Sequence, residues 1–164
     1  MARFATTLHV PRPVDEVFAF VSDFRNAVHW DPRTYAAEQL TPGSPGIGTR
    51  FVLTGGVLPR PVLRRLRIPA SLVGMRLPYD VVEFTPPSAF TLAGESRLVR
   101  YRDRLEFTAD GGGTRVRYLA ELHLRGPLAV GEPLLRPLFS RIGRDATRDL
   151  ADAVVRGTGG PDRP

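Results

Sequence analysis

The sequence predicts an α+β fold in which a curved antiparallel sheet wraps around one long C-terminal helix. Three observations predict this arrangement. A strand pattern over residues 3–10 leads at once into a short helical stripe. Several strand patterns separated by short turns follow between residues 35 and 125. Apolar residues at helical spacing then run from Pro133 or Pro137 to about Arg156. Consecutive strands joined by short turns favour an antiparallel sheet.

The first element alternates between apolar and polar residues over 3–10, as a half-buried strand does. Pro11 and Pro13 end it, and Pro13 suits the first turn of a helix because its missing N–H costs nothing there. The helix that follows carries one apolar stripe formed by Val14, Val17, Phe18 and Val21. Residues 23–31 predict a second short helix or turn, which Pro32 closes.

The middle of the chain contains further predicted strands at 35–40, 48–54, 79–84, 89–94, 97–108 and 114–125. Glycine- and proline-rich turns separate most of them. The segment 57–78 is less regular, because four prolines interrupt leucines that stand among arginines. It predicts a short amphipathic helix, a lid or an irregular excursion. Residues 1–156 form a single predicted domain, and we expect the glycine- and proline-rich tail 157–164 to be disordered.

The composition excludes several kinds of chemistry. The chain has 164 residues, no cysteine and no lysine, so disulfides, thiol catalysis and lysine Schiff bases are ruled out. The formal net charge is +6, but the arginines are spread along the chain without a nucleic-acid-binding motif, so we expect no nucleic-acid partner. No apolar run is long enough to span a membrane and no signal peptide is evident, which predicts a cytoplasmic protein.

The two late strands place one carboxylate on an apolar face. Strand 97–108 alternates so that Asp103 shares a face with apolar residues, and strand 114–125 presents a matching apolar face. A carboxylate on an inward face is costly unless it is hydrogen-bonded, paired or near water. Burial would raise its pKa and suit it to general acid or base work. The alternative is a structural role, at a wet pocket mouth or in an ion pair with arginine.

Aromatic residues near Asp103 offer further ligand contacts. Tyr101 and Tyr118 each present an apolar ring and a hydroxyl group that would orient a ligand or simply pack in the core. Trp30, the only tryptophan, covers one end of the pocket or packs as a core residue. The three histidines lack the spacing of a metal site. We therefore expect neither a metal ion nor an organic cofactor.

Three segments together resemble the START-like helix-grip superfamily (SRPBCC), which includes polyketide cyclases and dehydratases and lipid-transfer proteins. They are the run Val-Pro-Arg-Pro-Val-Asp-Glu-Val-Phe at 10–18 with Trp30 downstream, the strand with its Pro-Pro turn at 79–87, and the glycine hairpin at 111–116. The resemblance covers nearly all of residues 3–156. It departs at 57–78, which is longer and more proline-rich than a simple hairpin.

The resemblance implies a helix-grip fold, with about seven strands around the C-terminal helix, two short helices after strand 1 and a hydrophobic ligand held between sheet and helix. Binding, sequestration or transport of a polyketide-like or lipid-like molecule is the leading function. The alternative is a polyketide cyclase or aromatase/dehydratase, with Asp103 as acid or base and Tyr101 or Tyr118 polarising a carbonyl. The expected pocket is lined by Trp30, Tyr101, Asp103, Tyr118, Leu122, Leu135, Leu138, Ile142 and Ala146.

A second kind of partner is suggested by arginines on the outer face of the late strands. They form the rows Arg100/Arg102/Arg104 and Arg115/Arg117. These rows would meet an acidic carrier protein or an anionic membrane, or they form a solvated face with interspersed glutamates. The segment 61–68 is also a possible membrane contact. The sequence carries no signal for an oligomeric state.

Overall fold

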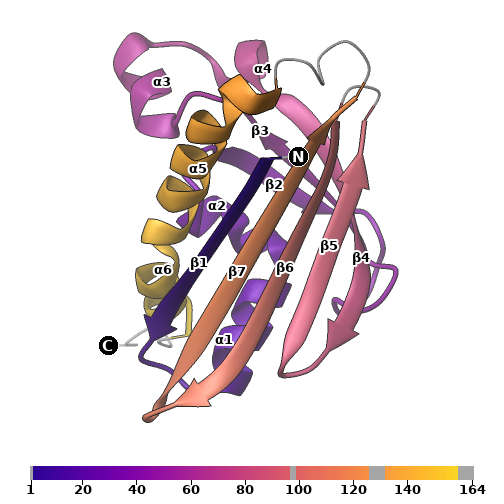
Figure 1. The fold of residues 1–164 in the computed structure, drawn as a ribbon, viewed down its shortest axis with the longest axis vertical. Helices are drawn as coiled ribbons and strands as arrows, with labels where there is room; N and C mark the ends of the chain where they lie inside the picture. Colours follow the sequence, from indigo (N-terminus) through magenta and orange to yellow (C-terminus); the bar gives the residue numbers. More distant parts are fainter. Residues whose placement is uncertain (1, 97–98, 126–131, 159–164) are drawn as a thin grey trace.

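A seven-stranded antiparallel sheet forms one layer of the protein, in the order β1-β7-β6-β5-β4-β3-β2 (Figure 1). The computed structural model describes residues 2–96, 99–125 and 132–158, without the side chains of 132–136, 138, 139 and 146. The strands are β1 (Ala2–Val10), β2 (Thr34–Gln39), β3 (Arg50–Gly55), β4 (Met75–Thr85), β5 (Ala89–Glu95), β6 (Val99–Asp110) and β7 (Gly113–Leu124). The predicted fold class is confirmed.

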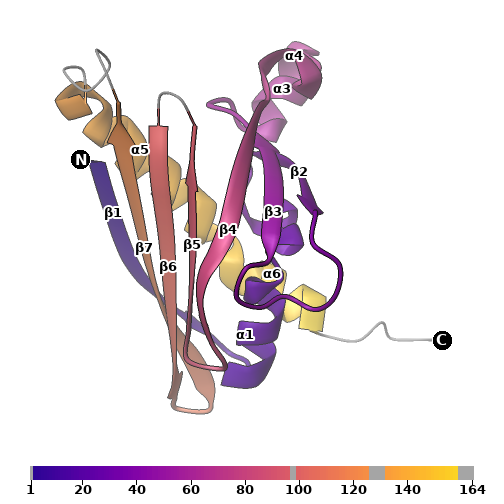
Figure 2. The ribbon, with the colours of Figure 1, turned by 90° about the vertical axis from the view of Figure 1, so that its right-hand side faces the viewer.

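The helices lie on the inner side of the curved sheet or at its ends. They are α1 (Val14–Ser22), the 3-10 turn η1 (Phe24–Asn26), α2 (Ala27–Trp30), α3 (Arg60–Leu66), α4 (Ala70–Val73), α5 (Glu132–Arg148) and α6 (Leu150–Thr158). Figure 2 shows α5 and α6 running diagonally along the inner side of the sheet. No helix in the described part of the chain is both long and apolar enough to cross a membrane.

Helix α5 lies very close to β1 because residue 143 is glycine. A Cβ atom at Gly143 would overlap the ring of Phe4 on β1. Any larger residue there would push the helix away from the sheet, since protein interiors are close-packed. Gly143 therefore helps to set how tightly the sheet grips its helix.

The C-terminal helix differs from the prediction in two ways. It is divided into α5 and α6 near Asp149, and the hydroxyl of Thr147 donates to the carbonyl of Gly143 at 3.0 Å just before the division. A threonine hydroxyl that bonds the carbonyl four residues earlier tends to bend a helix. Helix α6 also continues through Gly157 and Thr158, where the Thr158 hydroxyl bonds the carbonyl of Val154 at 2.9 Å. The rest of the expected tail, 159–164, lies outside the described residues.

The irregular segment 57–78 forms α3, α4 and the first residues of β4. Its base is fastened to the turn before β2: the amide of Arg60 donates to the carbonyl of Pro32 at 2.8 Å, and the Tyr35 hydroxyl donates to Leu58 at 2.6 Å. Strand β4 begins at Met75, four residues before the predicted start, and includes Pro78. The pairing of β3 with β4 accommodates this proline opposite Val52.

Two groups of aromatic rings fill the space between the sheet and the helices. Phe18 of α1 makes edge-on contacts with three phenylalanines of the sheet, Phe84, Phe90 and Phe107. The second group contains Phe24, Trp30, Phe51, Tyr79 and Tyr101. Because edge-on aromatic pairs add to the free energy of burial, both groups stabilise the concave face.

Candidate functional site

The structure buries Asp103 on the concave face of the sheet. Asp103 is in the middle of β6, with Leu92 of β5 and Ala120 of β7 as its strand partners. The residue is 6% exposed. Side chains alternate between the two faces along β6, so Asp103 lies on the same inner face as Tyr101, Leu105 and Phe107. A surface ion pair, one of the structural alternatives for Asp103, does not fit this degree of burial.

Two tyrosines surround the Asp103 carboxyl group. The hydroxyl of Tyr118 on β7 donates a hydrogen bond to Oδ1 of Asp103 at 2.9 Å. Tyr79 of β4 supplies a second hydroxyl group as a polar neighbour. Both tyrosines are buried. The site thus joins one carboxyl group and two phenol groups away from bulk water.

Burial is the main influence on the ionisation of this group. It raises the pKa of Asp103 to about 6, against the opposing effect of hydrogen bonds from Tyr118 and Tyr79. The negative charge of Asp31 raises that pKa further. The same burial, together with the Asp103 charge, raises the pKa of Tyr118 well above its usual value. Asp103 can therefore exchange a proton near neutral pH, while Tyr118 stays a neutral donor.

Tyr101 lies beside this group, but its hydroxyl has a different partner. It donates to the backbone carbonyl of Pro78, and its ring packs on Tyr79 with centroids 4.6 Å apart. The strand partner of Tyr101 on β5 is Gly94, where a Cβ atom would overlap both the Tyr101 ring and the Pro78 carbonyl. The phenol groups at Asp103 are accordingly those of Tyr118 and Tyr79, whereas the Tyr101 hydroxyl is bonded elsewhere.

Trp30 and Asp31 approach the site from the end of α2. Trp30 is 3% exposed and packs on Phe24, and its indole N–H has no acceptor among the described residues. The Asp31 carboxylate accepts bonds from the amide of Arg33 at 2.9 Å and from the hydroxyl of Thr34 at 2.7 Å. Burial raises the pKa of Asp31 against these hydrogen bonds. The turn 30–34 therefore carries the unpaired indole N–H of Trp30 and, in Asp31, a second carboxylate near Asp103.

Sequence reasoning missed the role of Arg33. Its side chain is only 10% exposed, and Nη1 lies 3.0 Å from Oδ2 of Asp145 on α5, as an ion pair rather than an aligned hydrogen bond. Its Nε donates to the carbonyl of Val57 at 3.0 Å. Arg33 thus connects the turn after α2 with the long helix and with the base of the α3–α4 segment. The Asp-Pro-Arg sequence gives no signal of a partner more than a hundred residues away.

The remaining predicted pocket residues belong to β7 and α5. Leu122 is half-buried at the edge of the core, and Ile142 of α5 is half-buried. The side chains of Leu135, Leu138 and Ala146 lie outside the described residues. Trp30, Tyr101, Asp103 and Tyr118 are all buried on the inner side of the sheet. The assignment of these residues to a ligand pocket stays a prediction.

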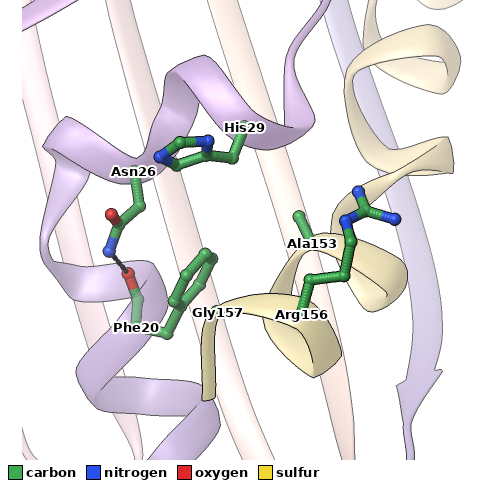
Figure 3. A pocket seen from close by; sticks show the side chains of 6 residues that line it. All are labelled: Phe20, Asn26, His29, Ala153, Arg156 and Gly157. Atoms are coloured by element: carbon green, nitrogen blue, oxygen red, sulfur yellow. Dashed lines mark hydrogen bonds between the residues drawn. The ribbon is translucent and has the colours of Figure 1, made fainter. Parts of the chain in front are cut away.

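Two hollows lined by described residues lie away from Asp103. The larger, about 450 Å³, opens between α1, α2 and α6, as Figure 3 shows. It is lined by Phe20, Asn26, His29, Ala153, Arg156 and Gly157. The amide of Asn26 is already bonded to the carbonyl of Phe20 at 2.8 Å, and His29 and Arg156 are exposed. This hollow offers no buried titratable group, so Asp103 remains the better candidate for chemistry.

The arginine rows on the outer face of the sheet are largely paired. Arg100 lies 3.2 Å from Glu95, Arg115 lies 2.9 Å from Asp110, and Arg117 lies 3.3 Å from Glu106. Arg104 contacts both Glu83 and Glu106. Such pairs in water contribute little stability, but they neutralise the face. The solvated-face interpretation of these rows fits the structure better than a basic docking surface.

A family model described as "Polyketide cyclase / dehydrase and lipid transport" matches residues 1–155. The chain belongs to this family. No curated protein matches it. Solved structures share the START-like fold at low sequence identity, and that likeness concerns the fold alone.

Three of these structures illustrate the range of proteins with this fold. A START superfamily protein from Mycobacterium smegmatis has a TM-score of 0.73 at 14% identity, over 95% of this chain and 99% of that one. The protein TTHA0849 from Thermus thermophilus has a TM-score of 0.71 at 16% identity, over 94% and 98% of the two chains. The di-domain ARO/CYC protein BexL of the BE-7585A biosynthetic pathway has a TM-score of 0.65 at 16% identity, over 99% of this chain and 50% of that one.

Proposed function

We propose that the protein binds a hydrophobic small molecule, polyketide-like or lipid-like, between the concave face of the sheet and helix α5. The observation that carries this proposal is the buried Asp103 carboxyl group, bonded to Tyr118 within an aromatic surface. A ligand pocket of this kind combines apolar walls with a few fixed polar groups. The leading function is sequestration or transport of the bound molecule.

Each predicted pocket residue has a distinct role in this proposal. Asp103 and Tyr118 hold a polar oxygen of the ligand, while Trp30 and Tyr101 supply aromatic walls. Leu122 extends the floor along β7. Helix α5 would supply the opposite wall through Ile142, together with the predicted residues Leu135, Leu138 and Ala146, whose side chains lie outside the described residues. Family membership supports a hydrophobic ligand.

The polar end of the ligand is best described as a carbonyl or phenol group. Protonated Asp103 donates a hydrogen bond to a carbonyl oxygen, whereas ionised Asp103 accepts one from a phenol. With a pKa of about 6, the carboxyl group is able to do either near neutral pH. The buried Trp30 N–H offers a second donor, because leaving such a group unpaired costs roughly 1–3 kcal/mol.

A cyclase or aromatase/dehydratase function is the second candidate, and the raised pKa of Asp103 favours it specifically. A general acid or base works best when its pKa lies near the operating pH. Asp103 would move the proton, and Tyr118, rather than Tyr101, would polarise a carbonyl group of a flexible chain when Asp103 is protonated and no longer accepts the Tyr118 hydrogen bond. Holding that chain in a reactive conformation would supply much of the rate.

Isothermal titration calorimetry of the full chain tests binding with two probes. The hydroxylated anthraquinone emodin represents a polyketide-like ligand, and palmitate represents a lipid-like one. We expect one of them to bind at micromolar concentration, and Tyr118→Phe to weaken that binding about ten-fold, because a ligand oxygen loses a buried partner. Tyr35→Phe, which removes a hydroxyl bonded to Leu58, is the matched control and leaves binding unchanged.

An activity assay with a poly-β-keto thioester, run beside the calorimetry, separates the two candidate functions. Binding without conversion of a poly-β-keto thioester, in the wild-type chain and in Asp103→Asn alike, supports a binding protein. Conversion that Asp103→Asn abolishes supports the enzyme. If neither probe binds, or if Tyr118→Phe and Asp103→Asn bind as the wild type does, the pocket assignment is wrong.

A further inference from the structure

The segment that forms α3 and α4 is strongly and uniformly basic. Between Gly56 and Tyr79 the chain has five arginines and no acidic residue, so this segment supplies +5 of the formal net charge of +6. In the described part of the chain, Arg64, Arg65, Arg67 and Arg76 form no ion pair with any carboxylate, and all four are exposed. The contrast with the paired arginines on the outer face of the sheet is clear.

Exposed apolar side chains gather in the same segment. Of the nine large hydrophobic residues that are exposed among the described residues, six lie here: Val57, Val62, Leu66, Leu72, Val73 and Met75. Leu72 is 77% exposed, and Leu66 is 58% exposed. Val62 and Leu66 are four residues apart and share one face of α3. Concentrated apolar exposure of this kind marks an interaction site rather than ordinary surface.

A hollow of about 370 Å³ lies between α3, α4 and Tyr35, and three arginines line it. They are Arg60, Arg64 and Arg67, and Leu63, Ile68, Pro69 and Ala70 supply the apolar part of the lining. Guanidinium groups pair with phosphate oxygens through geometrically matched hydrogen bonds. The hollow therefore has the chemistry of a site for an anionic phosphate group next to apolar chains.

Arg67 holds its place at a conformational cost. It is the positive-φ residue that ends α3, with φ 54°, and its amide donates to the carbonyl of Arg64 at 3.2 Å. Glycine is the usual residue at such a helix end, because other residues are disfavoured in the left-handed region. Strained residues of this kind cluster at functional sites, which supports a functional use of the Arg67 charge.

We propose that the α3–α4 tip, residues 57–76, docks the protein on an anionic phospholipid membrane. Figures 1 and 2 agree that α3 and α4 project at the end of the sheet where α5 begins. Leu66, Leu72 and Val73 enter the lipid interface, while the surrounding arginines contact headgroup phosphates. A projecting tip suits a membrane better than a protein partner, which needs a matching surface of roughly 800 Å² on each side. This proposal stands apart from the ligand pocket.

Co-sedimentation of the full chain with vesicles tests the proposal. We expect binding to vesicles of phosphatidylcholine with about 30% phosphatidylglycerol, little binding to phosphatidylcholine alone, and a steep loss of binding as salt rises. Failure to bind the anionic vesicles at low salt would overturn the proposal. Equal binding to both vesicle types would also overturn it. The same holds if calorimetry detects binding of inorganic phosphate while the protein binds no vesicles.

Two double variants distinguish binding through the α3–α4 tip from binding through the net charge of the protein. Arg64→Gln with Arg65→Gln removes two charges, and we expect about 30-fold weaker binding, since each basic residue near an anionic surface contributes about five-fold. The matched control Arg115→Gln with Arg117→Gln removes the same charge from the outer face and changes binding by less than about three-fold. An equal loss in both double variants would show that net charge alone is responsible.

The variant Arg67→Gly distinguishes a role of Arg67 in membrane binding from a role in stabilising the fold. Glycine relieves the left-handed conformation, so we expect the thermal midpoint to stay the same or rise, while vesicle binding falls about five-fold. A lower thermal midpoint, or unchanged binding, would contradict the role given to this residue.

The depth of the tip is measured by labelling, because the wild-type chain has no cysteine. Leu72→Cys and the control Ile47→Cys, which replaces another exposed residue at 72% exposure in the loop before β3, each receive one environment-sensitive nitrobenzoxadiazole label. Anionic vesicles should increase and blue-shift the emission at position 72 but leave position 47 unchanged. The reverse pattern, or no change at 72, would exclude insertion of this tip.

Discussion

The Tyr118 hydroxyl lies 2.9 Å from Oδ1 of Asp103, and this pair is the polar centre of the concave face. The two residues are on neighbouring strands but are not direct partners: Asp103 faces Ala120, and Tyr118 faces Leu105. The small side chain of Ala120 lies opposite the carboxyl group, where a larger one would crowd it. The diagonal distance between such residues is within the reach of a tyrosine.

This relationship makes a direct prediction for the ionisation of Asp103. Tyr118→Phe removes a hydrogen bond that stabilises the charged form, so the pKa of Asp103 should rise above its value of about 6. NMR titration of the aspartate side-chain carboxyl carbons measures the change. Tyr101→Phe is the control, because that hydroxyl donates to Pro78 and should leave the pKa of Asp103 in place. A similar shift of the Asp103 pKa in both variants would show that Tyr118 is not its specific hydrogen-bond donor.

The raised pKa of Asp103 also predicts how stability depends on pH. Between about pH 4 and pH 6 the folded protein keeps a proton on Asp103 that the unfolded chain has released, so this group's contribution to stability falls as pH rises. The shift corresponds to roughly 3 kcal/mol. The free energy of unfolding of Asp103→Asn, relative to the wild type, should increase by about that amount from about pH 4 to pH 7. Urea unfolding at several pH values measures it, and a pH-independent difference would contradict the prediction.

Gly94 is predicted to be necessary for the position of Tyr101. Gly94→Ala would place a methyl group against the Tyr101 ring and the Pro78 carbonyl, and should lower the free energy of unfolding by about 1–3 kcal/mol. Gly46→Ala is a matched control, because nothing lies within 4 Å of its added Cβ atom. Equal effects of the two substitutions in urea unfolding would show that the close approach at Gly94 is unimportant.

The ion pair between Arg33 and Asp145 should contribute more than exposed ion pairs do. A double-mutant cycle with Arg33→Met and Asp145→Asn is expected to give a coupling energy of about 1–2 kcal/mol, because Arg33 is nearly buried. The same cycle on Arg50 and Asp80, with side chains 57% and 46% exposed, should give a clearly smaller coupling energy, because both charges are solvated. If the two coupling energies are equal, Arg33 does not hold α5 in the way inferred.

Most of the fold could be predicted because local patterns were strong. The alternation on β6 and β7 distinguishes inner from outer residues, and each strand is long enough for its period to be unambiguous. The structure of the segment 57–78 could not be predicted, because prolines and isolated leucines obscure any period there. Its short helices depend on contacts with the turn at Pro32–Tyr35, which no local pattern encodes.

The candidate site could be predicted in part, for a similar reason. Face alternation identified Asp103 and Tyr118 as inward residues, but it did not show which tyrosine hydroxyl reaches the carboxyl group. That choice depends on Gly94 and Pro78, which take Tyr101 elsewhere. Tyr79, on the distant strand β4, and the Arg33–Asp145 pair arise from tertiary packing alone. Sequence periodicity carries no information about such pairings.

The most direct test of the central claim is NMR of the aspartate side-chain carboxyl carbons while emodin or palmitate is added to the full chain. Our account predicts that the Asp103 resonance moves with saturation, that its pKa changes in the complex, and that Tyr118→Phe reduces both effects. A probe that binds while Asp103 keeps its chemical shift and its pKa of about 6 would contradict the account. If resonances of the hollow at Phe20 and His29 shifted instead, the ligand site would belong there.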